Sequence, residues 1–128
     1  MLRDYGQGMR YDRPVPEDCL FCKMAAGTID VPKLHDDDLV FAIRDINPRA
    51  PVHVLVIPRR HIADARELSE ADSEILVRMF MAARAGAEAE GMLKRGYRIA
   101  FNVGEDAGMT VNHLHMHVIG GRRLGAEG

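Results

Sequence analysis

The sequence predicts an α+β fold with one antiparallel sheet, one long helix and a short N-terminal helix. Short apolar segments bounded by Pro, Gly or Asn follow one another along the chain, which is typical of strands joined by turns. A single long segment between two pairs of these strands repeats its apolar residues at intervals of three and four, as a helix does. This order differs from the repeated strand–helix–strand units of parallel α/β proteins.

The N-terminal region divides into a leader and the start of the domain. Residues 1–16 mix Gly, Pro, Arg, Asp and Tyr without periodicity, so we expect a flexible leader followed by one domain over residues 17–128. The segment CLFCKMAAG has helical spacing, with Asp18 as the expected N-cap and Gly27 as the expected end. The domain should therefore begin with a short helix.

This short helix carries the chain's two cysteines, Cys19 and Cys22. Cysteines separated by two residues are poorly placed to join distant parts of a secreted fold by a disulfide. The spacing C-x-x-C fits a metal site or a redox pair better.

Two strands are expected next. Residues 39–45 alternate in polarity and place the carboxylate of Asp45 at the exit of the strand, before an Asn-Pro breaker. Residues 52–57 are apolar on both faces apart from His53. His53 is therefore expected as a polar side chain on a buried strand.

A long helix is expected over residues 69–90. Ser69 and Asp72 resemble a capping box, and Gly91 is placed to end the helix. One wide apolar stripe is formed by Ile75, Leu76, Met79, Phe80, Ala83 and Ala87. Two further strands should follow, over residues 97–102 and residues 113–119.

Composition excludes several classes of protein. With 47% hydrophobic and 28% charged residues the chain resembles ordinary globular proteins rather than disordered ones. A net charge of -2 supplies no basic field for a nucleic acid polymer, and no apolar run approaches the roughly 20 residues that span a membrane. We therefore expect neither partner and place the protein in the cytoplasm.

The strongest functional pattern is HLHMHV. On a strand His113, His115 and His117 would share one face, with apolar residues on the other, so three groups that titrate near neutral pH lie together. Such a face suits either a metal ion or a nucleophile with hydrogen-bonding partners. The preceding loop NVGEDAGMTVN offers glycine N–H groups and the Thr110 hydroxyl to phosphate oxygens, which favours chemistry at phosphorus.

The segment GMTVNHLHMHVIGGR resembles the His-φ-His-φ-His-φ-φ signature of the histidine triad (HIT) superfamily, where φ is apolar, and is most similar to the Hint branch. The similarity runs from residue 19 to residue 123. It implies a HIT-like α+β fold, a homodimer, and hydrolysis or transfer at the α-phosphate of a nucleotide.

The resemblance implies a role for each histidine of the motif. His115 would be the nucleophile that forms a covalent nucleotidyl-histidine, and His113, His117 and His53 would arrange and protonate groups around it. Thr110 would help the leaving group to depart. In the Hint branch a serine is usual at position 110, so the hydroxyl is kept in this chain.

The resemblance also implies the nucleotide-binding residues. Asp45 would accept the two vicinal ribose hydroxyls, and the base would pack beside it. The base pocket is expected from Phe21, Met24, Ile43 and Ile46, and the phosphate contacts from Asn102, Gly108 and Thr110. Met109 stands where a glutamine is common and Asn112 where an aromatic residue is common, so the preference for leaving groups should differ.

The leading hypothesis is hydrolysis of purine nucleoside phosphoramidates, either AMP-amines or aminoacyl-adenylates. The alternatives are a dinucleoside polyphosphate hydrolase, a nucleotide-binding regulatory module with incidental activity, and a metal-storage or zinc-structured protein. No organic cofactor is expected. A structural zinc ion is expected on Cys19, Cys22, His53 and His113, and the alternative is two reduced thiols without metal.

Overall fold

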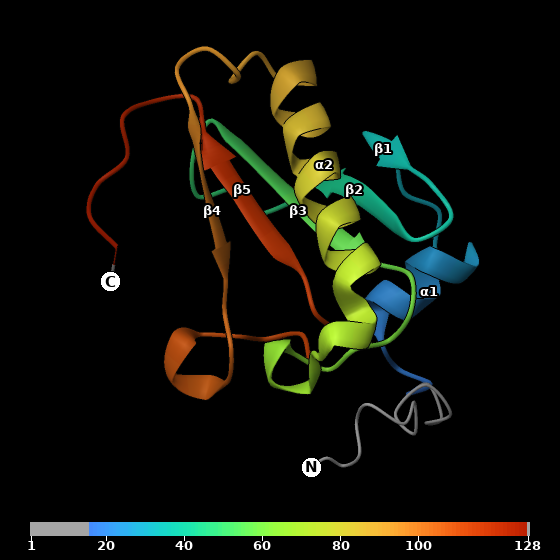
Figure 1. The fold of residues 1–128 in the computed structure, drawn as a ribbon. Coiled ribbons are helices and arrows are strands. Elements are labelled where there is room, and N and C mark those ends of the chain that lie inside the picture. Colours follow the sequence, from blue (N-terminus) through green and yellow to red (C-terminus); the bar gives the residue numbers. More distant parts are fainter. Residues whose placement is uncertain (1–15, 128) are drawn as a thin grey trace.

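The computed structural model describes residues 16–127, so the predicted leader lies almost wholly outside the described residues. The domain is one five-stranded antiparallel sheet in the order β1-β2-β3-β5-β4, with a long and a short α-helix (Figure 1). The strands are β1 (His35–Asp36), β2 (Val40–Arg44), β3 (Val52–Pro58), β4 (Tyr97–Phe101) and β5 (Met116–Gly120). The helices are α1 (Leu20–Ala26), α2 (Ser73–Ala89) and the 3-10 turns η3 (Ala65–Glu67), η4 (Glu70–Asp72) and η5 (Glu105–Ala107). The predicted fold class is confirmed.

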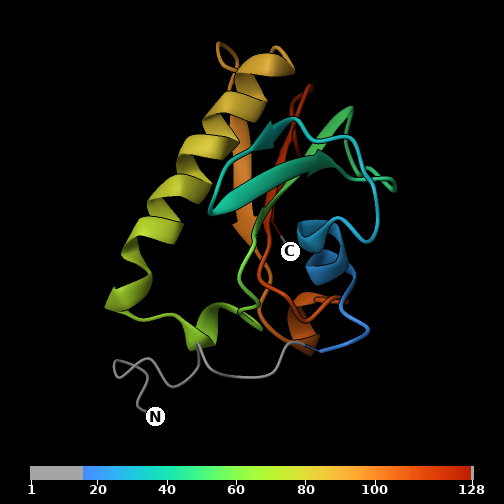
Figure 2. The same ribbon diagram turned by 90° about the vertical axis from the view of Figure 1, so that its right-hand side faces the viewer.

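The two helices lie on opposite faces of the sheet. Figure 2 shows α2 along one face and α1 beside the other. The α2 face holds the larger apolar core, in which Met79 and Ala83 pack against Val54, Met116 and Val118. The face toward α1 has a smaller apolar cluster of Cys19, Phe21, Phe41, Ile43, Leu55 and Ile57. Because α1 has only seven residues, much of this second face is left for a site.

The long helix starts and ends as its sequence predicts. Ser69 and Asp72 form the expected capping box, and the first turn is the 3-10 segment η4. At the other end Gly91 has a φ of 77°, and Met92 N–H donates to Ala87 O at 2.8 Å. This left-handed closing turn suits glycine, which has no Cβ to clash.

Three expectations about the elements need correction. The N-cap of α1 is Cys19 and not Asp18, because the Cys19 sulfur accepts the Cys22 N–H at 3.4 Å. Strand β5 begins at Met116, so His113 and His115 precede it, and Leu114 N–H donates instead to Ile62 O at 2.6 Å. The two-residue strand β1 was not predicted, because so short a segment shows no periodicity. Among residues 16–127 no helix is both long and apolar enough to span a membrane.

Candidate active site

The three motif histidines do not share one environment. His115 and His117 line an open cavity of about 270 Å³ on the α1 side of the sheet, which we call the histidine cavity. The side chain of His113 instead points to the two cysteines, with its Nδ1 3.3 Å from Cys19 Sγ. The predicted common face therefore breaks at His113, because the regular alternation of β5 starts only at Met116.

All eight predicted nucleotide-binding residues line the histidine cavity. Its apolar wall comes from α1 and β2, and its polar end from the β2 exit and the β4–β5 loop. The eight are Phe21, Met24, Ile43, Asp45, Ile46, Asn102, Gly108 and Thr110. Ile46 is 89% exposed, so this side chain stands at the mouth of the cavity. Segments more than 80 residues apart in sequence thus meet, while the roles of these residues stay predictions.

His115 is held in one tautomer by the backbone. Its Nδ1–H donates to the carbonyl oxygen of His113 at 2.7 Å, which leaves Nε2 unprotonated when the ring is neutral. Burial lowers the pKa of His115 below its ordinary value, so the ring is uncharged at neutral pH. A neutral imidazole with one free nitrogen is the nucleophilic form.

His53 and His117 form a second chain of hydrogen bonds. The Arg49 N–H donates to His53 Nδ1 at 3.2 Å, so the proton of the neutral His53 ring lies on Nε2. His53 Nε2–H then donates to His117 Nδ1 at 2.9 Å, which leaves the proton of His117 on Nε2. The Asn102 amide lies 3.3 Å from this Nε2. Burial, with the neighbouring His115 and His53, lowers the pKa of His117 to about 4.

Asp45 and the β4–β5 loop complete the polar end of the cavity. Asp45 Oδ1 accepts the Asn47 N–H at 2.9 Å, while Oδ2 lies 3.5 Å from His53 Nε2. The Gly108 N–H already donates to Glu105 O at 2.9 Å. This hydrogen bond closes the turn of η5, and the phosphate contact expected of Gly108 stays a prediction. Gly108 has a φ of 80°, which suits glycine, and shapes the loop that carries Thr110.

A second group of side chains lies next to the cavity, and we call it the thiol cluster: Cys19, Cys22, His61 and His113. Cys22 Sγ lies 3.2 Å from His61 Nδ1, and the two Nδ1 atoms of His61 and His113 lie 3.1 Å apart. His113 Nε2–H donates to Pro58 O at 2.8 Å, so its Nδ1 lone pair faces the thiols. Burial and the neighbouring Cys19 thiol raise the pKa of Cys22 to about 12 when no metal is bound. The four ligand atoms lie within 4.8 Å of one another, close enough to hold one metal ion.

The structure places His61, and not His53, in this cluster. Strands β3 and β5 are antiparallel, and His53 pairs with Ile119 near the end of β5. His61 follows the end of β3 and therefore lies beside the start of β5, where His113 is found. Sequence reasoning missed His61 because no local pattern marks it. The antiparallel order of the two strands was the signal that could have identified it.

The fold and the site together define a class of protein: an α+β domain in which alternating histidines lead into the last strand beside an open cavity. The HIT domain family matches residues 26–124, and the chain belongs to this family.

Known relatives agree with this assignment. The chain is 42% identical to an uncharacterized HIT-like protein of Synechococcus elongatus, over 84% of this chain and 94% of that protein. It is 40% identical to the purine nucleoside phosphoramidase of Escherichia coli K12, over 85% of this chain and 92% of the relative. A HIT family hydrolase from Clostridium thermocellum superposes with a TM-score of 0.84 at 43% identity, covering 88% of this chain and 98% of that one. These relatives support a hydrolase.

Proposed function

We propose that the protein hydrolyses purine nucleoside phosphoramidates, either AMP-amines or aminoacyl-adenylates, through a covalent nucleotide on His115. The observation that carries this proposal is the hydrogen bond from His115 Nδ1–H to His113 O. This bond leaves the Nε2 lone pair of His115 free to act as a nucleophile in the cavity that the residue lines. The 40% identity to a purine nucleoside phosphoramidase supports the choice of substrate.

The reaction proceeds in two steps. His115 Nε2 attacks the α-phosphorus, and the bond from phosphorus to the leaving group breaks. From an AMP-amine the phosphorus–nitrogen bond breaks, and the amine keeps the electron pair and takes up a proton delivered by the Thr110 hydroxyl or His117 Nε2. From an aminoacyl-adenylate the phosphorus–oxygen bond breaks, and the carboxylate departs with the electron pair as an anion. Water then cleaves the histidine–phosphorus bond and returns a proton to the site. His117 N–H and the Asn102 amide stabilise charge on the nonbridging oxygens.

Asp45 holds the nucleoside in this scheme. Its carboxylate lies at the polar end of the cavity, where it accepts the two ribose hydroxyls. The base packs between the α1 side chains Phe21 and Met24 and the β2 residue Ile43.

The test of the reaction class compares three substrates on the pure protein: adenosine phosphoramidate, an aminoacyl-adenylate and a diadenosine polyphosphate. Turnover of the first two supports the proposal. Cleavage of the last alone would identify a dinucleoside polyphosphate hydrolase, and nucleotide binding without turnover would identify a regulatory module.

A second test addresses the covalent step. Rapid quenching followed by intact mass spectrometry should show an adduct of one nucleoside monophosphate, which maps to His115. Because each half-reaction inverts phosphorus, a chiral substrate should react with net retention. Net inversion together with no adduct would show direct attack by water.

We further propose that the thiol cluster binds a structural zinc ion. A tetrahedral zinc site separates two nitrogens by about 3.3 Å and nitrogen from sulfur by about 3.6 Å. The cluster has nitrogens 3.1 Å apart and sulfur–nitrogen distances of 3.2 to 3.5 Å, which fit this geometry before any ion is placed. When bound, the ion would link α1 to the end of β3 and the start of β5. Both cysteines are free thiols, which suits the cytoplasm that we propose as the compartment.

Elemental analysis of protein purified without chelator tests the zinc proposal. It should find about one zinc per chain, lost in Cys19→Ser. No zinc in either protein would leave two reduced thiols and reject the site.

We also propose a symmetric homodimer. The exposed side chains Val77, Phe80 and Met81 of α2 lie beside Tyr97 and Ile99 of the edge strand β4, and form one apolar surface. A twofold partner would cover this surface. Light scattering at micromolar concentration should give a dimer mass, and Phe80→Glu should give a monomer. A monomer mass for the unchanged chain rejects this proposal.

A further inference from the structure

One cationic side chain stands at the end of the histidine cavity. Arg49 lies just before β3 and lines the cavity together with His115 and His117. Its N–H binds His53 Nδ1, which anchors the residue beside the histidines. Arg49 therefore borders the space in which the proposed reaction takes place.

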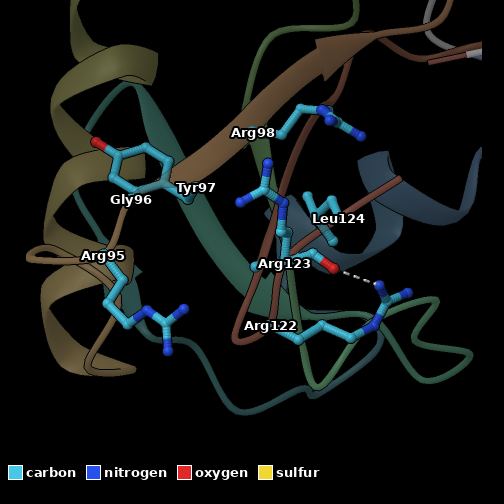
Figure 3. A pocket seen from close by; sticks show the side chains of 8 residues that line it. Arg95, Gly96, Tyr97, Arg98, Arg122, Arg123 and Leu124 are labelled. Carbon is cyan, nitrogen blue, oxygen red and sulfur yellow. Dashed lines mark hydrogen bonds between the residues drawn. The ribbon is translucent and has the colours of Figure 1, made fainter. Parts of the chain in front are cut away.

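A second group of arginines lies at the end of β5. A groove of about 430 Å³ at the start of β4 and the end of β5 is lined by Arg95, Gly96, Tyr97, Arg98, Gly120, Arg122, Arg123 and Leu124, and we call it the arginine groove (Figure 3). Figure 3 shows Arg123 near the middle of the groove, with Arg95 to its left, Arg98 above it and Arg122 below it. Its four positive charges lie in a chain whose net charge is -2.

Few negative groups oppose these charges. Arg98 Nη2 lies 3.4 Å from the Glu127 carboxylate, which is 79% exposed, and donates to Gly125 O at 2.9 Å. Arg122 donates to the Arg123 carbonyl oxygen at 2.8 Å. Within the described part of the chain, Glu127 is the one carboxylate paired with an arginine of the groove. A further anion would therefore find uncompensated positive charge here.

Arg98 of the groove shares one face of the sheet with two of the histidines. Ala100 pairs with His117, and Arg98 pairs with Ile119, which in turn pairs with His53. Directly paired residues point to the same face, so Arg98 lies on the face of His53 and His117. Two residues of a strand span about 7 Å, which is the distance along β4 from Arg98 to Ala100, the partner of His117. A leaving group with a chain of a few atoms can span that distance.

The pairing of the strands places the groove relative to the cavity. Along β5 the face runs from His115 past His117 to Ile119, and Arg98 and His53 flank Ile119. Arg49, which binds His53, borders the cavity at this end of β5, and the arginine groove lies beyond Ile119.

We propose that Arg49 and the arginine groove select a departing group that carries an oxyanion, either a carboxylate or a phosphate. This inference rests on the proposed phosphoramidate hydrolysis and names the substrate class for it. Arg49 forms an ion pair with the oxyanion of a short leaving group, and Arg98 and Arg123 do so with the oxyanion of a longer one. A departing group with a second positive charge is repelled.

The experiment uses adenosine 5′-phosphoramidates of four amines of similar size. Glycine carries a carboxylate, 2-aminoethyl phosphate a phosphate, glycinamide no charge, and ethylenediamine a second positive charge. We expect kcat/KM to be about tenfold higher for the two substrates with anionic leaving groups than for the glycinamide substrate. The ethylenediamine substrate should have a lower kcat/KM than the glycinamide substrate. The larger gain of the two anionic arms identifies the natural oxyanion, and the preference should shrink as salt is added.

Variants assign the preference to the arginines. Arg49→Gln should reduce it to about twofold, Arg49→Lys should keep most of it, and the pair Arg98→Gln with Arg123→Gln should act mainly on the phosphate arm. Arg44→Gln is the matched control, because Arg44 lies close by on β2 but its guanidinium is bonded to both oxygens of Glu90. It should keep the wild-type preference.

The outcomes separate this inference from the proposed function. No hydrolysis of any arm by the unchanged protein rejects the proposed function itself. Hydrolysis of all four arms with equal kcat/KM overturns the inference alone. An equal loss on every arm in Arg49→Gln also overturns it, since Arg49 would then act only by holding His53. Each variant's melting temperature shows whether it has folded.

Discussion

Two groups of histidines lie next to each other along the strand pair β3 and β5, and their surroundings differ. In the thiol cluster, at the end of β3 and the start of β5, the Nδ1 atoms of His61 and His113 converge on two sulfurs. In the histidine cavity, His115 and His53 each form a hydrogen bond with a backbone group and, together with His117, border an open space. The same side chain thus suits metal binding in one place and nucleophilic chemistry in the other. The neighbours decide which, through the nitrogen that they leave free.

The two groups are joined through single residues. The His113 ring belongs to the thiol cluster, while its carbonyl oxygen accepts the His115 proton. The centroid of the Phe21 ring lies 5.7 Å from that of His113 and 5.1 Å from that of His115, in both cases edge to face. A disturbance of the thiol cluster should therefore reach the cavity, whereas loss of a ring in the cavity should leave the thiols in place.

The largest effect is expected from His115→Ala. Turnover should fall by at least about 10³-fold, because no other ring has the same free nitrogen in this position. AMP binding and the measured zinc content should stay close to those of the unchanged protein. Steady-state kinetics, calorimetry with AMP and elemental analysis measure the three properties. Retention of a tenth of the activity would contradict the nucleophilic role.

Cys22→Ser should act on the other group. Loss of one thiolate ligand should remove the zinc and lower the melting temperature by about 10 °C, with only a partial loss of activity. Treatment with a chelator should give the same shift in the unchanged protein and none in the variant. His61→Ala is expected to match Cys22→Ser, while His53→Ala should keep the metal. Loss of zinc from His53→Ala instead would restore the ligand set first predicted from the sequence.

Asp45→Asn should weaken substrate binding about tenfold, with a smaller effect on kcat. The matched substrate lacks the ribose 2′-hydroxyl, and the unchanged enzyme should lose affinity for it. The variant should discriminate little between the two substrates if the carboxylate holds that hydroxyl. Full discrimination by Asp45→Asn would place the ribose elsewhere.

A lower pH should separate the cavity histidines from ordinary ones. A folded-state pKa of about 4 for His117, against 6.5 when unfolded, means that the folded state binds fewer protons between these values. The stability that comes from this difference is fully present above pH 6.5 and is lost as the pH falls toward 4. Activity should therefore persist well below pH 6.5. An acid limb of kcat/KM centred at 6.5 would refute the shift.

The smallest effect is expected from Phe21→Leu, which alters the contact between the two groups. Removing ring edges from His113 and His115 should lower the free energy of unfolding by about 1 kcal/mol and raise KM about twofold. Zinc content should not change. Urea unfolding and kinetics measure both effects, and Met24→Leu, which alters the same wall of the cavity without removing an aromatic ring, is the control.

The sequence alone determined the fold class, the long helix with its two caps, and eight of the residues that line the histidine cavity. Periodicity, capping and turn residues are local signals, and the resemblance to the family supplied the eight cavity residues. Only the tertiary structure decided which histidine joins the thiols, because that depends on the antiparallel pairing of β3 and β5. The tertiary structure also decided that the Gly108 N–H donates within a turn, and that Arg98 of β4 lines one groove with Arg122 and Arg123, which follow β5. Such contacts join residues far apart in sequence, and no local pattern encodes the distance between them.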